Sequence, residues 1–278
     1  MNFVLSLIAL QTQCKQRSAP YGSLLHTLIL ASLLLASCAP LPTRQVAEPI
    51  SQSLAGELMQ VWYDNSSHVD SVQGLAKVKV HTPEKTLNGT QVILAEKPNR
   101  LRAETLSPFG SPLLLLAADG ENLGVLLPGQ NLFYTGAATP ANLGRFVRIP
   151  LQLKDLVSLL LYQPPLIKAR TEEAFKLLDE GWLLVRYNSQ RRQELTFNND
   201  RQLVDVSYYD KNELFLQLSY GNFAEEGERF PRRFGIELPE EQITASLKFS
   251  DLETNGTLRP DIFQLTPASG ARIVSLDD

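Results

Sequence analysis

The sequence TLSPFGSPLLLLA, residues 105–117, places the strongest constraint on the fold. Its pattern predicts the end of one strand, a short turn, and a second strand that is apolar throughout. Pro108 and Pro112 have no N–H to donate to a sheet, so we expect the residues between them to be held out of it, and Gly110 gives the turn freedom in φ. Phe109 is therefore expected at the tip of a loop. A large apolar ring there either folds back onto its own domain or serves a partner or a membrane.

Alternating apolar and polar residues flank this loop on both sides. The alternation is clearest at 76–81, 92–94 and 101–105, and it returns after residue 174. A period of two predicts half-buried antiparallel strands with one solvated face. We count about eleven strands in all. From Asn255 onward we expect irregular chain that pairs only briefly at a sheet edge.

Three segments have helical periodicity instead. Apolar residues recur at helical spacing from Ile50 to about residue 65, with Ser51 or Ser53 as the candidate cap. Thr139-Pro140 predicts the start of a short helix that runs through Phe146 or Val147. A second apolar helical face follows Pro150 and ends before Pro164-Pro165.

A single meander of this length must hide one apolar face, so it curls or splits into two sheets. We therefore expect an α+β, mostly β fold: an open, incomplete antiparallel β-barrel with a helical lid over an apolar interior. Side chains could fill this interior, or it could stay open for an apolar ligand. The candidate cavity residues are Val78, Val80, Leu101, Leu216, Leu218, Leu247 and Phe249, and the candidate lid residues are Leu153, Leu156, Val157 and Leu160.

Composition argues against several functions. Removing the two basic residues of 1–37 leaves 24 basic (26 minus 2) against 30 acidic residues, a net charge of −6, which does not attract nucleic acid. Both cysteines lie within the first 38 residues, so no disulfide framework is expected in the body. The body has only His68 and His81 as imidazoles and no Gly-x-Ser-x-Gly or nucleotide-binding glycine motif. We expect a monomer with no metal, no cofactor and no enzymatic activity.

The N-terminus has the pattern of an export signal. Lys15 and Arg17 precede an apolar run at 24–35, which is too short for a membrane span. The run ends in Leu35-Ala36-Ser37-Cys38, which resembles the lipobox of bacterial lipoproteins, whose cysteine is lipidated and becomes the new N-terminus. The resemblance implies a signal peptide at 1–37 and a lipidated Cys38, followed by a tether over 38–49. An ordinary secretory signal with a chance cysteine is the alternative, and a second apolar run at 3–10 leaves the true start open.

Two motifs in the body resemble the LolB family, outer-membrane receptors for lipoproteins in the LolA/LolB superfamily. Residues 107–113, SPFGSPL, are similar to the family's Asn-Pro-Leu-Gly-Ser loop, and Ile149-Pro150-Leu151 with the helix after it is similar to its Ile-Pro-Leu segment. The resemblance covers roughly 50–249 and implies a LolA/LolB-like lipid-binding domain over 50–278. It implies an eleven-stranded open barrel whose cavity holds acyl chains.

The same resemblance implies a function and partners. Phe109 would be the membrane-insertion residue, and Ala39 after the cysteine points to the outer membrane, with the body in the periplasm. The implied partners are outer-membrane lipids, acyl chains of lipoproteins or of free lipids, and a periplasmic LolA-like carrier. The chain departs from the family in its length, in Phe for Leu at the loop, and in the tail beyond Thr254, which leaves the cargo open. A non-catalytic structural envelope lipoprotein with a filled core is the alternative function.

Overall fold

The computed structural model describes residues 46–178, 181–223 and 229–277. These residues belong to one compact unit, Gln45–Asp278. The expected signal peptide at 1–37, the candidate lipidation site Cys38 and most of the expected tether lie outside the described residues.

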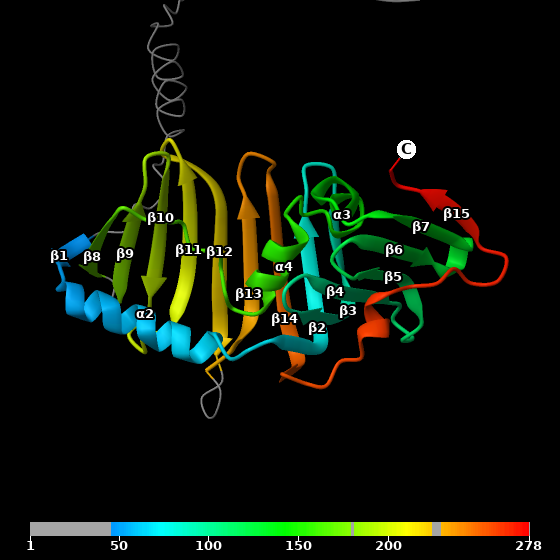
Figure 1. The fold of residues 1–278 in the computed structure, drawn as a ribbon, viewed down its shortest axis with the longest axis horizontal. Helices are drawn as coiled ribbons and strands as arrows, with labels where there is room; N and C mark the ends of the chain where they lie inside the picture. Colours follow the sequence, from blue (N-terminus) through cyan, green and yellow to red (C-terminus); the bar gives the residue numbers. More distant parts are fainter. Residues whose placement is uncertain (1–45, 179–180, 224–228, 278) are drawn as a thin grey trace, which may run out of the picture. The chain divides into compact units, whose positions relative to one another are not determined.

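The described chain forms one sheet of fifteen strands (Figure 1). They are β1 (Val46–Pro49), β2 (Ser71–His81), β3 (Thr86–Glu96), β4 (Arg100–Leu106), β5 (Pro112–Ala118), β6 (Asn122–Leu127), β7 (Leu132–Ala137), β8 (Thr171–Leu177), β9 (Trp182–Tyr187), β10 (Arg191–Phe197), β11 (Leu203–Asp210), β12 (Glu213–Phe223), β13 (Pro231–Leu238), β14 (Ile243–Thr254) and β15 (Arg272–Ser275). Their order in the sheet is β1-β8-β9-β10-β11-β12-β13-β14-β2-β3-β4-β5-β6-β7-β15. Because β1 and β15 are its two edges and do not pair with each other, the barrel is open, as expected.

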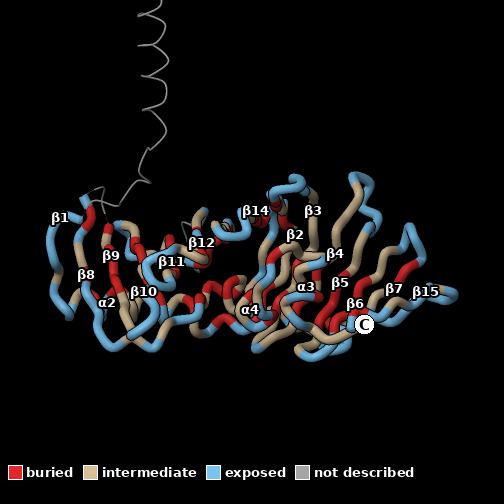
Figure 2. The backbone as a smooth tube through the Cα atoms, turned by 90° about the horizontal axis from the view of Figure 1, so that it is seen from above, coloured by how far each residue is buried: buried red, intermediate tan, exposed pale blue. Residues whose placement is uncertain are grey.

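The pairing of β14 with β2 joins the two halves of the sheet. It is antiparallel over nearly the full length of both strands and sets Leu247 opposite Val78 and Ala245 opposite Val80. All other neighbours are also antiparallel except β7 and β15, which run parallel. The predicted alternation is present in β2, where Ala76 and Val80 are buried while Lys77 and Lys79 are exposed. Figure 2 shows a second contrast: the central strands contain buried residues, whereas the edge strands β1 and β15 are mostly exposed.

Three α-helices lie in the described residues: α2 (Gln52–Ser66), α3 (Pro140–Val147) and α4 (Leu153–Leu160). Figure 1 shows α2 lying across β8–β12, with α4 in front of β13 and β14. The expected caps are confirmed, since the Ser51 side chain accepts from Leu54 N and the Thr139 side chain accepts from Asn142 N. We call α3, α4 and the residues between them the lid.

The strand count exceeds the expected eleven, partly because of two edge strands. β1 is made by the last four residues of the expected tether, and its backbone pairs with β8. All four residues of β1 are exposed, so no apolar alternation marked it in the sequence. β15 comes from the tail, where we expected only brief edge pairing, and three of its four residues are exposed.

Residues beyond Thr254 form hydrogen bonds with the end of the sheet and with the start of the lid. The Ile262 carbonyl oxygen accepts a hydrogen bond from Arg102 Nη1 at 2.6 Å. Farther on, the Asp277 carboxylate accepts from Ala137 N at 3.0 Å and from Asn142 Nδ2 at 3.0 Å. Because Asn142 lies in the first turn of α3, these bonds tie the end of the chain to the start of the lid.

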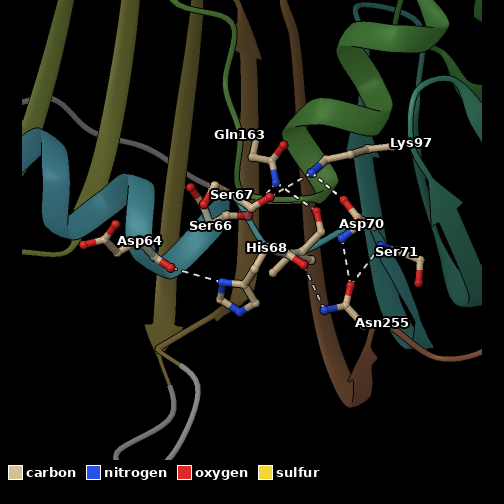
Figure 3. A network of polar contacts seen from close by, with 10 residues as sticks. Asp64, Ser66, Ser67, His68, Asp70, Ser71, Lys97, Gln163 and Asn255 are labelled. Atoms are coloured by element: carbon tan, nitrogen blue, oxygen red, sulfur yellow. Dashed lines mark hydrogen bonds and ion pairs between the residues drawn. The ribbon is translucent and has the colours of Figure 1, made fainter.

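A polar network holds the joint between α2, β2 and the end of the lid (Figure 3). Gln163 Nε2 donates to the carbonyl oxygens of Ser66 and Val69, which fixes the chain just beyond α4 to the end of α2. Lys97 Nζ donates to Ser67 O at 3.1 Å and to Asp70 Oδ1 at 2.8 Å. The joint is therefore held by side chains from several segments that are distant in sequence.

Asn255, at the end of β14, completes this network. Its Oδ1 accepts from Asp70 N at 2.7 Å, and its Nδ2 donates to His68 O at 3.0 Å. The His68 ring in turn contacts the Asp64 carbonyl oxygen through Nδ1, at 3.1 Å, so this imidazole lies at the end of the helix.

Candidate functional site

A cavity of about 290 Å³ lies between the concave face of the sheet and the lid. Strands β2–β5 and β12–β14 form its floor and walls, and α4 with the residues just before it forms its roof. The interior is therefore not filled by side chains, and the filled-core arrangement is not the one found. Its lining residues are Val78, Val80, Leu87, Asn88, Gly89, Gln91, Ile93, Leu101, Ala103, Thr105, Leu114, Leu116, Phe146, Val147, Arg148, Ile149, Leu156, Leu159, Leu160, Leu218, Tyr220, Phe234, Gly235, Ile236, Ala245 and Leu247.

Five of the seven candidate cavity residues line this space: Val78, Val80, Leu101, Leu218 and Leu247. Each lies at an inward position of its strand, as the alternation predicted.

Leu216 and Phe249, the other two candidates, are buried but do not line the cavity. Leu216 pairs with Tyr208, whose hydroxyl donates to Pro165 O at 2.8 Å, so the chain after α4 covers this part of the sheet. Phe249 packs edge-on against Phe234, with ring centroids 5.8 Å apart. Both residues face inward, but they lie beyond the ends of the cavity.

The four candidate lid residues all lie in α4, but they have different neighbours. Leu156 and Leu160 line the cavity, whereas Leu153 and Val157 are buried away from it. Residues on the same face of a helix can contact different neighbours, and here the side chains of Leu153 and Val157 pack into the core instead of lining the cavity. Leu159 also lines the cavity and was missed.

The segment from Phe146 to Ile149, which spans the end of α3 and the two residues after it, lines the cavity and was also missed as a site. The sequence feature that could have identified this segment is the Ile-Pro-Leu motif beginning at Ile149, which indicated only the family resemblance. Arg148 caps α3 in the left-handed region, with φ 64°, and its N–H donates to Gly144 O at 3.0 Å. This sharp end to the helix turns the chain toward the cavity.

An aromatic cluster closes one end of the cavity. Tyr220 and Phe234 are lining residues whose ring centroids lie 5.7 Å apart, and Tyr162 packs edge-on against Tyr220 at 4.9 Å. Burial raises the pKa of Tyr162 and of Tyr220 well above 10, so both phenols stay neutral. The Tyr162 hydroxyl donates to Leu203 O at 2.9 Å, while the Tyr220 hydroxyl has no hydrogen-bond partner among the described residues.

The cavity opens near the start of β3. Leu87 is 37% exposed, and Asn88 beside it is also exposed, although both line the cavity. We call residues 87–89 the mouth. Farther in, Gln91 Nε2 donates to Thr105 Oγ1 at 3.1 Å, so these two polar lining residues satisfy each other.

Phe109 stands at the tip of the β4–β5 loop and is 95% exposed, so the ring does not fold back onto its domain. The loop itself is well ordered by hydrogen bonds. Ser107 N donates to Ser111 O at 2.8 Å, and Ser107 Oγ accepts from Phe109 N at 3.3 Å. Gly110, at φ 83°, completes the turn. Residues 109–111 lie outside both strands, as expected, and Pro112 is the first residue of β5, opposite Leu106.

The Phe109 loop and the mouth lie at the same end of the sheet. Thr90 of β3 pairs with Leu106 of β4. Residues 87–89 precede Thr90 and the loop follows Leu106, so both continue beyond this pair in the same direction. Leu113, at the start of β5, is 54% exposed and adds apolar surface beside the loop.

Within the described residues, no helix has the length and apolar character needed to cross a membrane.

Comparison with known proteins gives likeness of structure only. No family model and no curated protein matches the chain. A DUF1329 family protein from Desulfovibrio piger matches over 81% of this chain and 100% of its own, with 16% identity and a TM-score of 0.47. A LolA superfamily protein from Nitrosomonas europaea matches over 74% of this chain and 97% of its own, with 15% identity and a TM-score of 0.45.

Proposed function

We propose that this protein binds acyl chains in its cavity and takes part in the transfer of lipoproteins or lipids into the outer membrane. The observation that carries the proposal is the cavity itself: about 290 Å³, lined almost entirely by aliphatic and aromatic side chains, and open at the mouth. Apolar ligands gain free energy by leaving water for such a space. The proposed role is that of a non-catalytic carrier.

The exposed Phe109 ring supports a delivery role in this proposal. Its backbone is fixed by the Ser107 hydrogen bonds, so little conformational entropy is lost when the ring enters an apolar layer. Because the loop lies at the same end as the mouth, an inserted ring would bring the mouth toward the bilayer.

The proposed anchor is a lipidated Cys38, which would hold the body on the periplasmic side of the outer membrane. A chain modified there would carry more than one acyl group, and stable anchoring requires more than a single chain. A LolA-like periplasmic carrier is the proposed donor of cargo. These parts of the proposal rest on the lipobox and on the motif resemblance.

The experiment compares lipid binding by three forms of the compact unit from Gln45 onward. Ala245→Phe adds a ring at a lining position of β14, and Thr244→Phe adds the same ring at the exposed neighbouring position. Mass spectrometry of the purified proteins should find acyl lipid on the native form and on Thr244→Phe, and much less on Ala245→Phe. Melting curves show whether Ala245→Phe remains folded, since overpacking costs about 1–3 kcal/mol. A native form that carries no lipid and binds no fluorescent fatty acid would contradict the proposal.

A further inference from the structure

One charged residue lines the cavity among the described residues, and it is Arg148. The residue is half-buried, so its side chain lies at the boundary between the cavity and solvent. All other lining residues are apolar or uncharged.

The backbone at Arg148 is unfavourable for an arginine. With φ 64°, the position is in the left-handed region, where helices usually end with glycine or asparagine. A cation is favourable at the end of a helix, but Arg145, one turn earlier and exposed, already meets that need. Helix capping alone therefore does not account for arginine at this position.

The guanidinium of Arg148 has no ion pair and no hydrogen bond within the part of the chain that the structure describes. Two other half-buried arginines of the sheet, Arg102 and Arg186, have partners: Arg102 is 2.6 Å from Glu104, and Arg186 is 2.8 Å from Glu172. The nearby polar lining pair, Gln91 and Thr105, is bonded internally. Five N–H donors beside an apolar cavity thus remain available to an anion.

We propose that the cavity takes a single-chain acyl ligand with an anionic head group, and that Arg148 binds this head group. The inference rests on the proposed acyl binding and narrows the cargo to a single-chain lipid rather than a lipoprotein, whose lipidated cysteine carries more than one acyl group. The chain lies among the aliphatic lining residues, and a carboxylate or phosphate pairs with the guanidinium, whose fork geometry suits both anions. A volume of about 290 Å³ is at the lower end of ligand pockets, which favours one chain over several.

The test measures displacement of a fluorescent fatty-acid probe by dodecanoic acid, dodecanol and dodecyl phosphate, at a pH where the acid is ionised. The native protein should prefer the anions to the alcohol by about tenfold or more, because hydrogen bonds to charged groups are strong. Arg148→Gln should lose this preference while it keeps its affinity for dodecanol. Arg148→Lys should retain part of the preference. Arg145→Gln, which changes a neighbouring arginine that does not line the cavity, should match the native protein.

The tighter of the two anions identifies the head group as a carboxylate or a phosphate. Equal affinity of the native protein for acid and alcohol would overturn the inference and leave acyl binding intact. Unchanged anion affinity in a folded Arg148→Gln would also overturn it. Failure of all three ligands to bind would reject the proposed function as well.

Discussion

Phe109 combines an exposed apolar ring with a rigid backbone. A substitution there should therefore affect lipid transfer without affecting the stability of the protein. Phe109→Glu should leave the free energy of unfolding nearly unchanged, within about 0.5 kcal/mol, because the ring makes almost no contact with its own domain. Transfer of lipid or lipoprotein to liposomes should fall strongly, because a carboxylate must be dehydrated to enter the bilayer. Phe109→Leu, which keeps an apolar tip, serves as the control. A stable Phe109→Glu protein with full transfer would rule out the delivery role.

Two buried tyrosines next to each other should respond in opposite ways to loss of the hydroxyl. The Tyr220 hydroxyl is buried without a hydrogen-bond partner among the described residues, so Tyr220→Phe should stabilise the protein by up to about 1 kcal/mol. Tyr162→Phe removes the bond to Leu203 O and should cost about 1 kcal/mol or more. Urea denaturation of both variants measures the difference. Equal losses in the two would show that the Tyr220 hydroxyl has a partner in solution.

At the scale of elements, the lid depends on its attachment beyond α4. Gln163→Leu removes both donors to the carbonyl oxygens of Ser66 and Val69, and it should lower stability by about 1–3 kcal/mol. Gln60→Leu, on the exposed face of α2, removes only a surface bond to Asp64 and is the matched control. The free energy of unfolding is measured for both. A loss of similar size in Gln60→Leu would mean that the anchor of the lid has no special role.

Sequence periodicity predicted most elements and the inward face of the alternating strands, but it did not predict where the cavity ends. Val78 and Phe249 both occupy inward-facing positions of their strands, but only Val78 lines the cavity. The extent of the cavity depends on where the lid and the aromatic cluster lie. That placement is set by contacts between distant segments, such as Gln163 with Ser66. The edge strand β1 was missed because its residues are exposed and its pairing is through the backbone alone. Arg148 was missed because no periodicity marks a helix cap as a lining residue.

At the scale of the whole molecule, the lipid anchor and the body should be separable. Cys38→Ser should leave an unlipidated, uncleaved precursor in the inner membrane, because the thiol is the proposed acceptor of the lipid. The body should fold as in the native protein, since Gln45–Asp278 is a compact unit. Membrane fractionation and mass spectrometry of the N-terminus check this outcome. Normal processing and outer-membrane localisation of Cys38→Ser would refute the lipoprotein assignment.

The pairing of β14 with β2 has a consequence for the order in which the chain can acquire its structure. Val78 and Leu247 face each other across this pair, so one wall of the cavity comes from segments about 170 residues apart. Contacts this distant slow folding. A nascent chain that ends at Leu238 has β2 but not β14, and it should expose apolar strands and aggregate. The cavity is therefore incomplete until nearly all of the polypeptide has been synthesised, and factors that shield the early strands would raise the yield of folded protein.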